Sequence, residues 1–484
     1  MTSLNAWKMA GVVFVLLATT AIAAQAQIFT TLVDFDGTPS GSGPLSPIIQ
    51  GGDGNFYGTT GNGGVDGWGS VFKTSPQGTL TILQSFTYND GFLPFGALLL
   101  DQDGNFHGTT NEGGFSNACV FGCGTLFQMT PVGVLTTLHH FCSTSNFCSD
   151  GALPVGQLVR GYDGNFYGVT HLDGAYLSGT VFRMTPKGAL TTLYNFGART
   201  GDGGSPNAGL VQADDGDFYG TTGGGGANRV GGTVFRMTPG GDLSTIYSFC
   251  ARSACEDGEE PYGVLFQGSD GSFYGTTQFG GSSSACDAGC GTIFKITRDG
   301  TLTTLHSFEN TDGVFPQTGL IQATDGNFYG GTTGGGGSGC AGFGCGTIFE
   351  ITPGGIFTTL HSFDGSDGEI FRGLIQATSG ILLGTTEGGG IGGCCGTVFS
   401  LSTGLRPFVT FVQVAGKVGQ TGGILGQGFT GTTSVSLNGT PANFTVVSDT
   451  FISATVPAGA STGYVMVTTP SGVLTSNVPF HVIQ

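Results

Sequence analysis

The chain has 484 residues, of which 94 are Gly and 39 are Phe, and its formal net charge is −18. Its 14 basic residues form no cluster against 32 acidic ones, so a nucleic-acid partner is excluded. The many Phe residues exclude a disordered chain despite the Gly content, because disordered chains lack aromatic side chains to bury.

Residues 1–26 have the pattern of a secretory signal peptide. Lys8 precedes an apolar stretch over residues 11–24, and Ala24-Gln25-Ala26 is a small-x-small cleavage site. The apolar run is short for a membrane anchor, and no other segment is apolar enough to cross a bilayer. We therefore predict export, to a secreted, periplasmic or cell-surface location, with no membrane span after cleavage.

Residues 27–404 consist of repeats of about 54 residues. Residues 319–363 form the most regular unit, with four strand-like runs called A (320–323), B (327–333), C (347–352) and D (357–363). An anchor residue in strand B recurs in every unit, at Tyr57, His107, Tyr167, Tyr219, Tyr274, Tyr329 and Leu383. The runs are rich in β-branched and aromatic residues and are separated by Asp-Gly or Gly-Gly turns, which predicts four-stranded antiparallel blades of a β-propeller.

The two ends of the repeat region predict that the ring closes. Strand C occurs seven times, but no strand D follows Phe399. A strand D without a preceding A, B or C stands at residues 28–35 instead. We therefore predict a seven-bladed propeller whose last blade is completed by residues 28–35, which removes an exposed sheet edge. An open solenoid is the alternative, but it would need polar capping repeats.

The repeat resembles the GloVer tandem-repeat family of bacterial exported proteins. The matching motifs are Asp-Gly-Asn-Phe-Tyr-Gly-Thr-Thr, Gly-Thr-Val-Phe and Leu-Thr-Thr-Leu-Tyr/His-x-Phe, which cover nearly all of residues 28–404. The resemblance implies an exported bacterial repeat protein and implies no activity.

A second domain is predicted over residues 407–484, where the repeat ends and Cys disappears. Short alternating runs lie at 408–414, 434–437, 451–456, 464–468 and 479–483, which predicts an Ig-like β-sandwich. The segments 425–429, 435–439, 453–457 and 465–469 look like those of an IPT/TIG domain. That resemblance implies a spacer or protein-contact module without catalytic residues. The predicted fold class is thus all-β, a propeller followed by a sandwich.

Twelve Cys residues form six close pairs, which behind a signal peptide favour disulfides. The pairs are Cys119/Cys123, Cys142/Cys148, Cys250/Cys255, Cys286/Cys290, Cys340/Cys345 and Cys394/Cys395. Adjacent Cα atoms lie closer than in most disulfides, so the last pair either forms a vicinal bridge or stays reduced. Zinc is disfavoured, because four ligands must converge and the pairs belong to different blades.

All six pairs are predicted on one face, which the D–A and B–C loops share. Constant turns on one side and long braced loops on the other favour a binding face, although long Gly-rich loops also need bracing for structural reasons alone. Aromatic side chains in the B–C loops are candidates for stacking on sugars or anchoring a protein, unless they pack under their own loops. The candidates are Trp68, Phe115, Tyr176, Phe279 and Phe343, together with His171, which replaces a small residue.

An Asp recurs in the D–A loops, and it allows two interpretations. A ring of carboxylates would bind Ca²⁺, whereas side-chain to backbone bonds would cap each turn. Identical placement in six blades favours capping, so no cofactor is predicted. The residues are Asp90, Asp150, Asp202, Asp257, Asp312 and Asp367.

We interpret the chain as a non-catalytic binding protein whose loop face contacts a glycan or protein at the cell surface, with the sandwich as spacer or docking module. One alternative is an extracellular lyase or glycan-processing enzyme, since the hairpins are similar to those of virginiamycin B lyase-like propellers. The catalytic His and Glu of those propellers have no match here, so that similarity is one of fold. A structural surface repeat protein is the other alternative.

Overall fold

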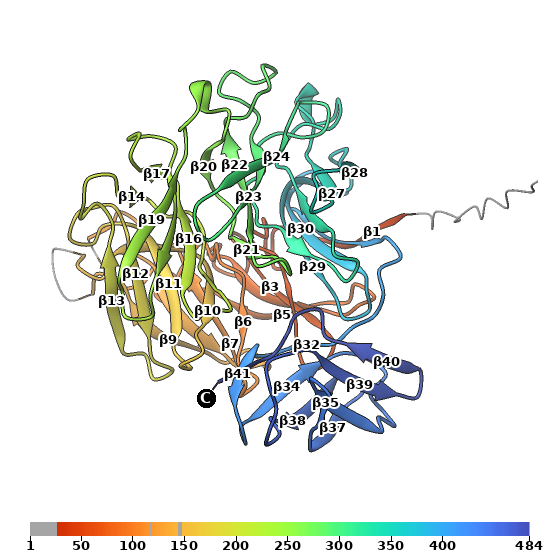
Figure 1. Cartoon of the computed structure of the whole chain (residues 1–484). Coiled ribbons are helices and arrows are strands. Elements are labelled where there is room, and N and C mark those ends of the chain that lie inside the picture. The colour runs from red at the N-terminus through yellow and green to blue at the C-terminus, as the bar shows by residue number, and fades with distance from the viewer. Residues whose placement is uncertain (1–26, 117, 144–147, 484) are drawn as a thin grey trace, which may run out of the picture.

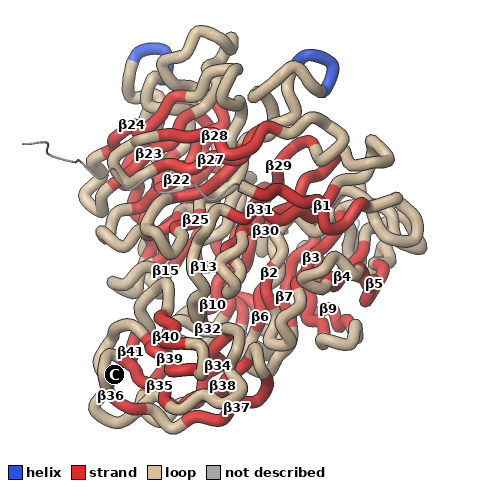
Figure 2. The backbone as a smooth tube through the Cα atoms, turned by 90° about the vertical axis from the view of Figure 1, so that its right-hand side faces the viewer, coloured by secondary structure: helices blue, strands red, loops and turns tan. Residues whose placement is uncertain are grey.

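The fold is all-β. A computed structural model describes residues 27–116, 118–143 and 148–483, so the predicted signal peptide lies outside the described residues. Within them, helical structure is limited to two single 3₁₀ turns, Ser253–Cys255 and Cys340–Gly342 (Figures 1 and 2). No helix of the described residues is long and apolar enough to cross a membrane.

Seven antiparallel sheets of the described residues follow one another along the chain, and each contains the strands A to D of one repeat. In sheet 5, strand A is split into two pieces that both pair with strand B. The sheets are: sheet 1, β2 (Ile49–Gln50), β3 (Phe56–Thr60), β4 (Ser70–Thr74), β5 (Leu80–Ser85); sheet 2, β6 (Leu99–Leu100), β7 (Phe106–Thr110), β8 (Thr125–Met129), β9 (Leu135–His140); sheet 3, β10 (Ala152–Arg160), β11 (Phe166–Leu172), β12 (Thr180–Met184), β13 (Leu190–Asn195); sheet 4, β15 (Val211–Gln212), β16 (Phe218–Thr222), β18 (Thr233–Met237), β19 (Leu243–Ser248); sheet 5, β20 (Glu259–Pro261) with β21 (Phe266–Gln267), β22 (Phe273–Phe279), β23 (Thr292–Ile296), β24 (Leu302–Ser307); sheet 6, β25 (Ile321–Gln322), β26 (Phe328–Gly331), β27 (Thr347–Ile351), β28 (Phe357–Ser362); sheet 7, β29 (Glu369–Gln376), β30 (Leu382–Gly388), β31 (Thr397–Ser402), β1 (Ile28–Asp34). A short ribbon of β14 (Gly203–Gly204) and β17 (Gly224–Gly225) adds to the loops of sheet 4.

The N-terminal strand β1 completes sheet 7, as the repeat pattern predicts. It pairs antiparallel with β31, with Thr30 opposite Ser400, and it carries a bulge between Thr31 and Val33. The pairing of strands C and D in sheets 1 to 6 has a register shift at the equivalent position. Residues 28–34 therefore take the place of strand D more than three hundred residues before the strand C with which they pair.

One kind of hydrogen bond joins five neighbouring pairs of the described sheets, including sheets 7 and 1. The Gln212 carboxamide oxygen accepts from the Tyr162 backbone N–H of the preceding sheet at 2.8 Å, and the same bond recurs at Gln267, Gln322 and Gln376. Gln50 likewise accepts from the Thr378 N–H at 3.0 Å. The junction between the last sheet and the first is thus built like the junctions within the array.

Strand B is buried on both faces because a sheet covers it on either side. The Tyr57 ring packs on Phe106 of the next sheet, with centroids 4.3 Å apart, and its hydroxyl donates to Asp53 at 2.9 Å. The next residue of strand B, Gly58, has no space for a side chain, because a Cβ there would lie 2.6 Å from the Phe72 ring of strand C. The Gly of the Phe-Tyr-Gly motif is therefore required because the aromatic ring of strand C packs directly against strand B.

Residues 408–483 form two four-stranded antiparallel sheets and a short parallel pair. The core between them contains Phe429, Ile452 and Val467. The predicted run at 408–414 is mostly not strand, and five strands were missed: β33 (Ala415–Lys417), β34 (Thr421–Leu425), β36 (Thr440–Pro441), β37 (Phe444–Ser448) and β40 (Gly472–Thr475). The first sheet is β32 (Thr410–Phe411), β34 (Thr421–Leu425), β38 (Phe451–Thr455), β37 (Phe444–Ser448); the second is β36 (Thr440–Pro441), β35 (Ser434–Leu437), β39 (Val465–Thr469), β40 (Gly472–Thr475); the pair is β33 (Ala415–Lys417) with β41 (His481–Ile483).

This C-terminal unit lies against the A–B turns of the sheets (Figure 1). The Thr450 hydroxyl donates to the Gly52 carbonyl at 2.8 Å, and Tyr162 stacks on His481 with centroids 5.5 Å apart. The D–A and B–C loops are on the other face, because strands A and B run in opposite directions. The C-terminal unit therefore leaves the loop face free.

Candidate ligand-binding site

The recurring Asp side chains of the D–A loops hold the backbone that follows strand D. The Asp257 carboxylate accepts from the Ala251 N–H at 3.0 Å and from the Tyr247 hydroxyl at 2.7 Å. His139 makes the corresponding contact with Asp150, Nε2 to Oδ2, at 2.9 Å. The recurring Asp residues thus cap their turns, and none belongs to a cluster of three or more potential metal ligands in the described parts of the chain. The His residues of strand D in sheets 2, 5 and 6 make this contact with the Asp carboxylates.

The same loops carry a strained residue just before their Pro. Non-Gly residues rarely adopt a positive φ, yet five D–A loops place one there: Leu93 (52°), Leu153 (57°), Ser205 (51°), Glu260 (51°) and Phe315 (56°). The residue after each of these Pro residues lines one central cavity. The repeated bend therefore brings one side chain per sheet to the centre of the molecule.

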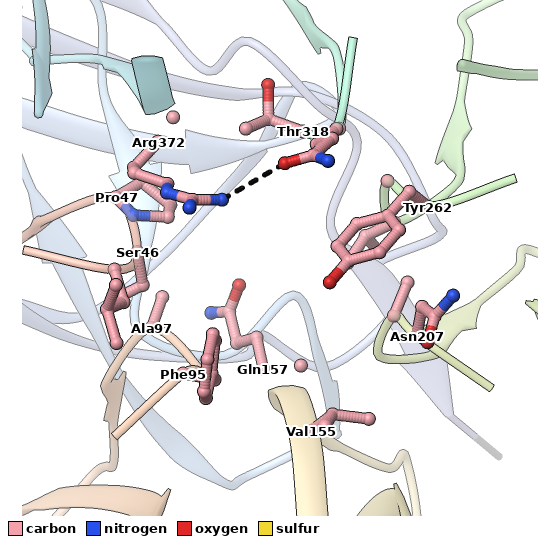
Figure 3. A pocket seen from close by; sticks show the side chains of 18 of the residues that line it. Ser46, Pro47, Phe95, Ala97, Val155, Gln157, Asn207, Tyr262, Thr318 and Arg372 are labelled. Atoms are coloured by element: carbon pink, nitrogen blue, oxygen red, sulfur yellow. Dashed lines mark hydrogen bonds between the residues drawn. The ribbon is translucent and has the colours of Figure 1, made fainter. Parts of the chain in front are cut away.

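These inward residues, one from each of the seven sheets, are called the mouth ring. They line a cavity of about 490 Å³, and Figure 3 shows several of them around its open space. In sheet 7, Phe371 takes the place of the Pro. The members in sheet order are Leu45, Phe95, Val155, Asn207, Tyr262, Gln317 and Arg372.

The mouth ring is the part of the D–A loop in which every repeat differs. Sheets 1 to 3 supply the apolar side chains Leu45, Phe95 and Val155, and sheets 4 to 7 supply polar or ionisable ones. This ring was not recognised from the sequence, although aligning six D–A loops on their Pro and the seventh on Phe371 reveals it. Repeats that keep their scaffold and vary one inward position are typical of a scaffold with a binding site.

Arg372 is held by two partners. Its Nε donates to the Glu387 carboxylate at 2.7 Å, and one terminal nitrogen donates to the Gln317 carboxamide oxygen at 3.2 Å. Glu387 follows the two Thr residues of strand B in sheet 7. The positive charge at the mouth is therefore neutralised within the protein, and the guanidinium plane is fixed.

Two hydroxyls at the cavity have no partner. Ser46 is only 3% exposed, and its Oγ forms no hydrogen bond among the described residues. Thr318 Oγ1 is likewise buried and unpaired within that part of the chain. Buried polar atoms are normally hydrogen-bonded, so two unpaired hydroxyls lining one cavity indicate a ligand or ordered water there.

Among the described residues, His171 is the one predicted site residue that lines this cavity. Its Nδ1 lies 3.2 Å from the Pro206 carbonyl oxygen, which leaves Nε2 available. Trp68 and Phe279 are half-buried: Trp68 packs edge-on against Phe92, and Phe279 packs against Phe315. Trp68 and Phe279 therefore pack under loops, which is the alternative to ligand binding considered for these aromatic residues.

The other three candidates are exposed on the loop face. Exposed fractions are 65% for Phe115, 55% for Tyr176 and 79% for Phe343. Phe115 contacts His140 of its own sheet, with ring centroids 4.6 Å apart. The contacts recorded for the described residues thus do not gather the B–C loop aromatics into one cluster.

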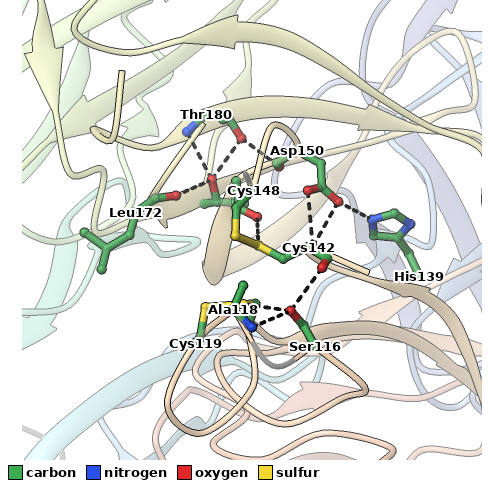
Figure 4. Close-up of a disulfide and its surroundings, with 12 residues drawn as sticks. Ser116, Ala118, Cys119, His139, Cys142, Cys148, Asp150, Leu172 and Thr180 are labelled. Carbon is green, nitrogen blue, oxygen red and sulfur yellow. Dashed lines mark hydrogen bonds and ion pairs between the residues drawn. A yellow bond between two sulfur atoms is a disulfide. The ribbon is translucent and has the colours of Figure 1, made fainter. Parts of the chain in front are cut away.

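All six predicted disulfides are formed, including the vicinal pair Cys394–Cys395. Figure 4 shows Cys142–Cys148, whose loop is held by Asp150, with the Cys142 N–H donating to it at 3.2 Å. One premise was wrong: the sulfur atoms of Cys119, Cys123, Cys142 and Cys148 do converge, within 4.8 Å of one another. They converge because the B–C loop of sheet 2 and the D–A loop that follows meet, and both pairs are oxidised there.

Several cysteines of these loops are buried beneath the loop surface. Cys290 is bonded to its predicted partner, but it is fully buried and belongs to the same core cluster as Val314. Its carbonyl oxygen accepts from the Phe315 N–H of the next D–A loop at 3.0 Å. Cys123 and Cys345 are buried in the same way. The buried cysteine of each of these disulfides therefore anchors a B–C loop to the sheets and is not accessible to a ligand.

A larger cavity, of about 1090 Å³, lies between the A–B turns and the C-terminal unit. Its polar lining includes Gln212 and Gln267, which already join neighbouring sheets. It is therefore part of a structural interface, whereas the mouth ring carries side chains that the scaffold does not need.

Comparison with solved structures finds extracellular domains of two hybrid two-component systems from Bacteroides thetaiotaomicron. Identity is 12% and 10%, the TM-score is 0.50 for both, and the matches cover 94% and 92% of this chain. The chain spans about half of those structures, 55% and 46%. At this identity the likeness shows the propeller-like fold alone. Comparison with curated protein sequences finds no match.

The repeat itself identifies the family. The profile of the Gloeobacter/Verrucomicrobia repeat matches residues 1–160, 116–342 and 232–447, overlapping along most of the sequence. This confirms the resemblance drawn from the Asp-Gly-Asn-Phe-Tyr-Gly motifs. The chain belongs to the Gloeobacter/Verrucomicrobia repeat family.

Proposed function

We propose that this chain is an exported, non-catalytic binding protein whose ligand, a glycan or a protein segment, enters the mouth ring from the loop face. The observation that carries the proposal is that the seven D–A loops keep their bend and flanking Leu or Ile but carry seven different residues at the position after the bend, which lines the cavity. A purely structural repeat has no need to vary that position.

The proposed architecture is a closed seven-bladed β-propeller followed by an Ig-like domain of the IPT/TIG type. The pairing of β1 with β31 and the Gln50–Thr378 bond support closure. The two four-stranded sheets of residues 410–475 support a sandwich. Its contacts with the A–B turns, such as Thr450 with Gly52, favour a docked module over a freely tethered spacer.

Two observations support export. The first 26 residues have a signal-peptide pattern. No free Cys occurs in the described residues, since all twelve form disulfides, which persist in oxidising compartments. A secreted, periplasmic or cell-surface location follows, with the exposed Phe115, Tyr176 and Phe343 available for contacts around the mouth.

The alternative of an enzyme is favoured by one observation: His171 and the Arg372–Glu387 pair line or border the same cavity. A lyase or hydrolase would need such groups to act as acid and base. Incubation of the protein with glycan substrates, followed by mass spectrometry of the products, tests this alternative, and His171→Ala should then abolish turnover.

The binding proposal is tested by separating the mouth from the outer loops. The full-length mature protein is screened against immobilised glycans and peptides, with Gln317→Ala as the mouth variant and Phe343→Ser as the outer-loop variant. The proposal predicts that Gln317→Ala weakens binding at least tenfold and Phe343→Ser less than threefold. The opposite order would overturn the mouth as the site.

A further inference from the structure

We infer that the ligand of the mouth ring is an uncharged sugar unit, held with its C–H face on the apolar arc and its hydroxyls on the polar arc. This inference rests on the proposed binding function and names the ligand class of the same site. Charge, the arrangement of the ring and unused hydrogen-bonding capacity each support it.

The charge at the mouth excludes strongly ionic ligands. Among the described residues, Arg372 is the one side chain lining the cavity that carries a permanent charge, and Glu387 compensates it at 2.7 Å. An anionic ligand would have to displace Glu387 and would enter a protein whose net charge is −18. A cationic ligand would compete with Arg372 for the same carboxylate. An uncharged ligand meets neither cost.

The ring has an apolar half and a polar half. Leu45, Phe95 and Val155 come from three consecutive sheets, so they form one continuous arc. The remaining members form the other arc, where Asn207 and Tyr262 have no side-chain hydrogen bond recorded among the described residues. A pyranose ring has the same division, because its axial C–H groups form an apolar face and its hydroxyls lie at the rim.

The hydrogen-bonding groups match hydroxyls. Ser46 Oγ and Thr318 Oγ1 are buried and unpaired among the described residues, and each can both donate and accept. The fixed Arg372 guanidinium and the Gln317 carboxamide both line the cavity and offer a donor beside an acceptor, which suits two neighbouring hydroxyls: the guanidinium donates to one and the carboxamide oxygen accepts from the next. Two adjacent hydroxyls are the defining feature of most sugars and are absent from peptides.

The cavity size fits the terminal unit of a glycan. Its volume of about 490 Å³ falls in the range of small-molecule sites, roughly 300–1,000 Å³. The C-terminal unit lies on the opposite side of the ring, against the A–B turns (Figure 1). A glycan chain would therefore enter by its end from the loop face.

The test is calorimetry on the full-length mature protein with three probes: neutral oligosaccharides of glucose, galactose or mannose, oligogalacturonates, and acidic or basic peptides. The variants are Tyr262→Phe, which removes one unpaired hydroxyl and leaves the packing intact, and Arg372→Gln/Glu387→Gln, which removes both charges together. Ile356→Ser is the control, since Ile356 is 71% exposed in a C–D turn on the opposite face.

We expect a neutral oligosaccharide to bind, with affinity falling about 3- to 10-fold in Tyr262→Phe, as for loss of one hydrogen bond, and at least tenfold in the double variant. Raising the salt from low to high concentration should change the affinity less than twofold, because no net charge is paired. Ile356→Ser should match the wild type.

Binding of oligogalacturonates or peptides, but not neutral sugars, with the same dependence on Tyr262 would overturn the sugar inference and leave the mouth as the site. Binding of any probe that neither mouth variant changes would overturn the proposed function itself. Failure of all three classes to bind would likewise overturn the sugar inference.

Discussion

Arg372 and Glu387 form an ion pair across strands A and B of sheet 7, with Nε and the carboxylate oxygen 2.7 Å apart. The side chains are 18% and 33% exposed, so water screens the pair only in part. Both residues stand at positions where the repeats differ from one another. The pair therefore belongs to the site rather than to the repeat scaffold.

Removing both members of this pair should destabilise the protein by less than the two single removals added together. Arg372→Gln leaves a half-buried carboxylate without its partner, which should lower the free energy of unfolding by about 1–3 kcal/mol. Arg372→Gln/Glu387→Gln should lower it by less than the sum of the single variants, with a coupling of about 0.5–2 kcal/mol. Urea unfolding of the wild type, the two single variants and the double variant measures this coupling energy. Strictly additive values would show that the pair does not interact.

Phe29 should contribute strongly to stability although it is the third residue of the predicted mature chain. Its ring stacks on His361 at 3.9 Å between centroids and on Phe399 at 5.2 Å, which ties β1 to sheets 6 and 7. Because Phe29 is partly buried, Phe29→Ala should cost about 2–3 kcal/mol, below the range for fully buried Phe. Ile28→Ala, at a position 61% exposed, is the matched control and should change stability by less than about 0.5 kcal/mol. Equal, small effects of both would contradict ring closure by β1.

The junction of sheets 2 and 3 departs from the repeat and should make the protein sensitive to acid. His107 replaces the anchor Tyr and is 2% exposed, and Asp101 stands where other repeats have Gly or Ala. Arg160 replaces the joining Gln and pairs with Asp101. Burial lowers the pKa of His107, so the unfolded chain takes up a proton near pH 6.5 before the folded chain does. Stability should therefore fall as the pH drops below about 6.5.

Restoring the repeat consensus at this junction should reverse that loss. In Asp101→Gly/His107→Tyr/Arg160→Gln, the new Tyr hydroxyl can donate to Asp103, as Tyr57 donates to Asp53. Asp101 must change too, because a Cβ at the equivalent Gly51 already lies 2.5 Å from the Tyr57 ring. We expect a gain of about 1–2 kcal/mol at neutral pH and a smaller fall in Tm between pH 7.5 and 5. His140 and His481, whose pKa values burial also lowers, remain in both proteins, so an unchanged pH dependence would exclude His107 as a cause.

The short disulfides should brace loops without forming the site. Cys119→Ser/Cys123→Ser opens a loop of about five residues, which the chain-entropy relation values at about 2 kcal/mol. Because the mouth ring lies in the D–A loops and contains no Cys, ligand affinity should stay within twofold of the wild type. Thermal unfolding and calorimetry of the same variant check both parts, and a tenfold loss of affinity with little change in Tm would place the site in the cysteine loops.

The repeat made most of the fold predictable. Strands B, C and D recur with the same aromatic residues, so their number, order and the completion of sheet 7 by residues 28–34 follow from the pattern. Apart from the short β14–β17 ribbon, the missed strands lie mainly in the C-terminal unit, where β34 contains two Gly and the side chains of β40 are mostly exposed. Neither shows the alternation of buried and polar residues that predicts a strand.

The site was less predictable, for a physical reason. Exposed aromatics such as Phe343 stand out in Gly-rich loops, whereas Gln317 and Arg372 stand out only when the loops are superimposed. Their approach to one another is set by the bend before each Pro, a backbone property with no side-chain signature at Leu93 or Phe315. The depth of a cysteine such as Cys290 was equally hidden, because Gly-rich loop sequence does not tell which residues turn back onto the sheet. His171 was found because it breaks the local pattern of strand B.

The most direct test of the account is a crystal structure of the full-length mature protein soaked with the neutral oligosaccharide that binds most tightly in solution. We expect a sugar ring in the cavity of the mouth ring, with its C–H face toward Phe95 and hydroxyls within hydrogen-bond distance of Arg372, Gln317 and Tyr262. Sugar density confined to the tips of the B–C loops, or to the cavity beside the C-terminal unit, would contradict it.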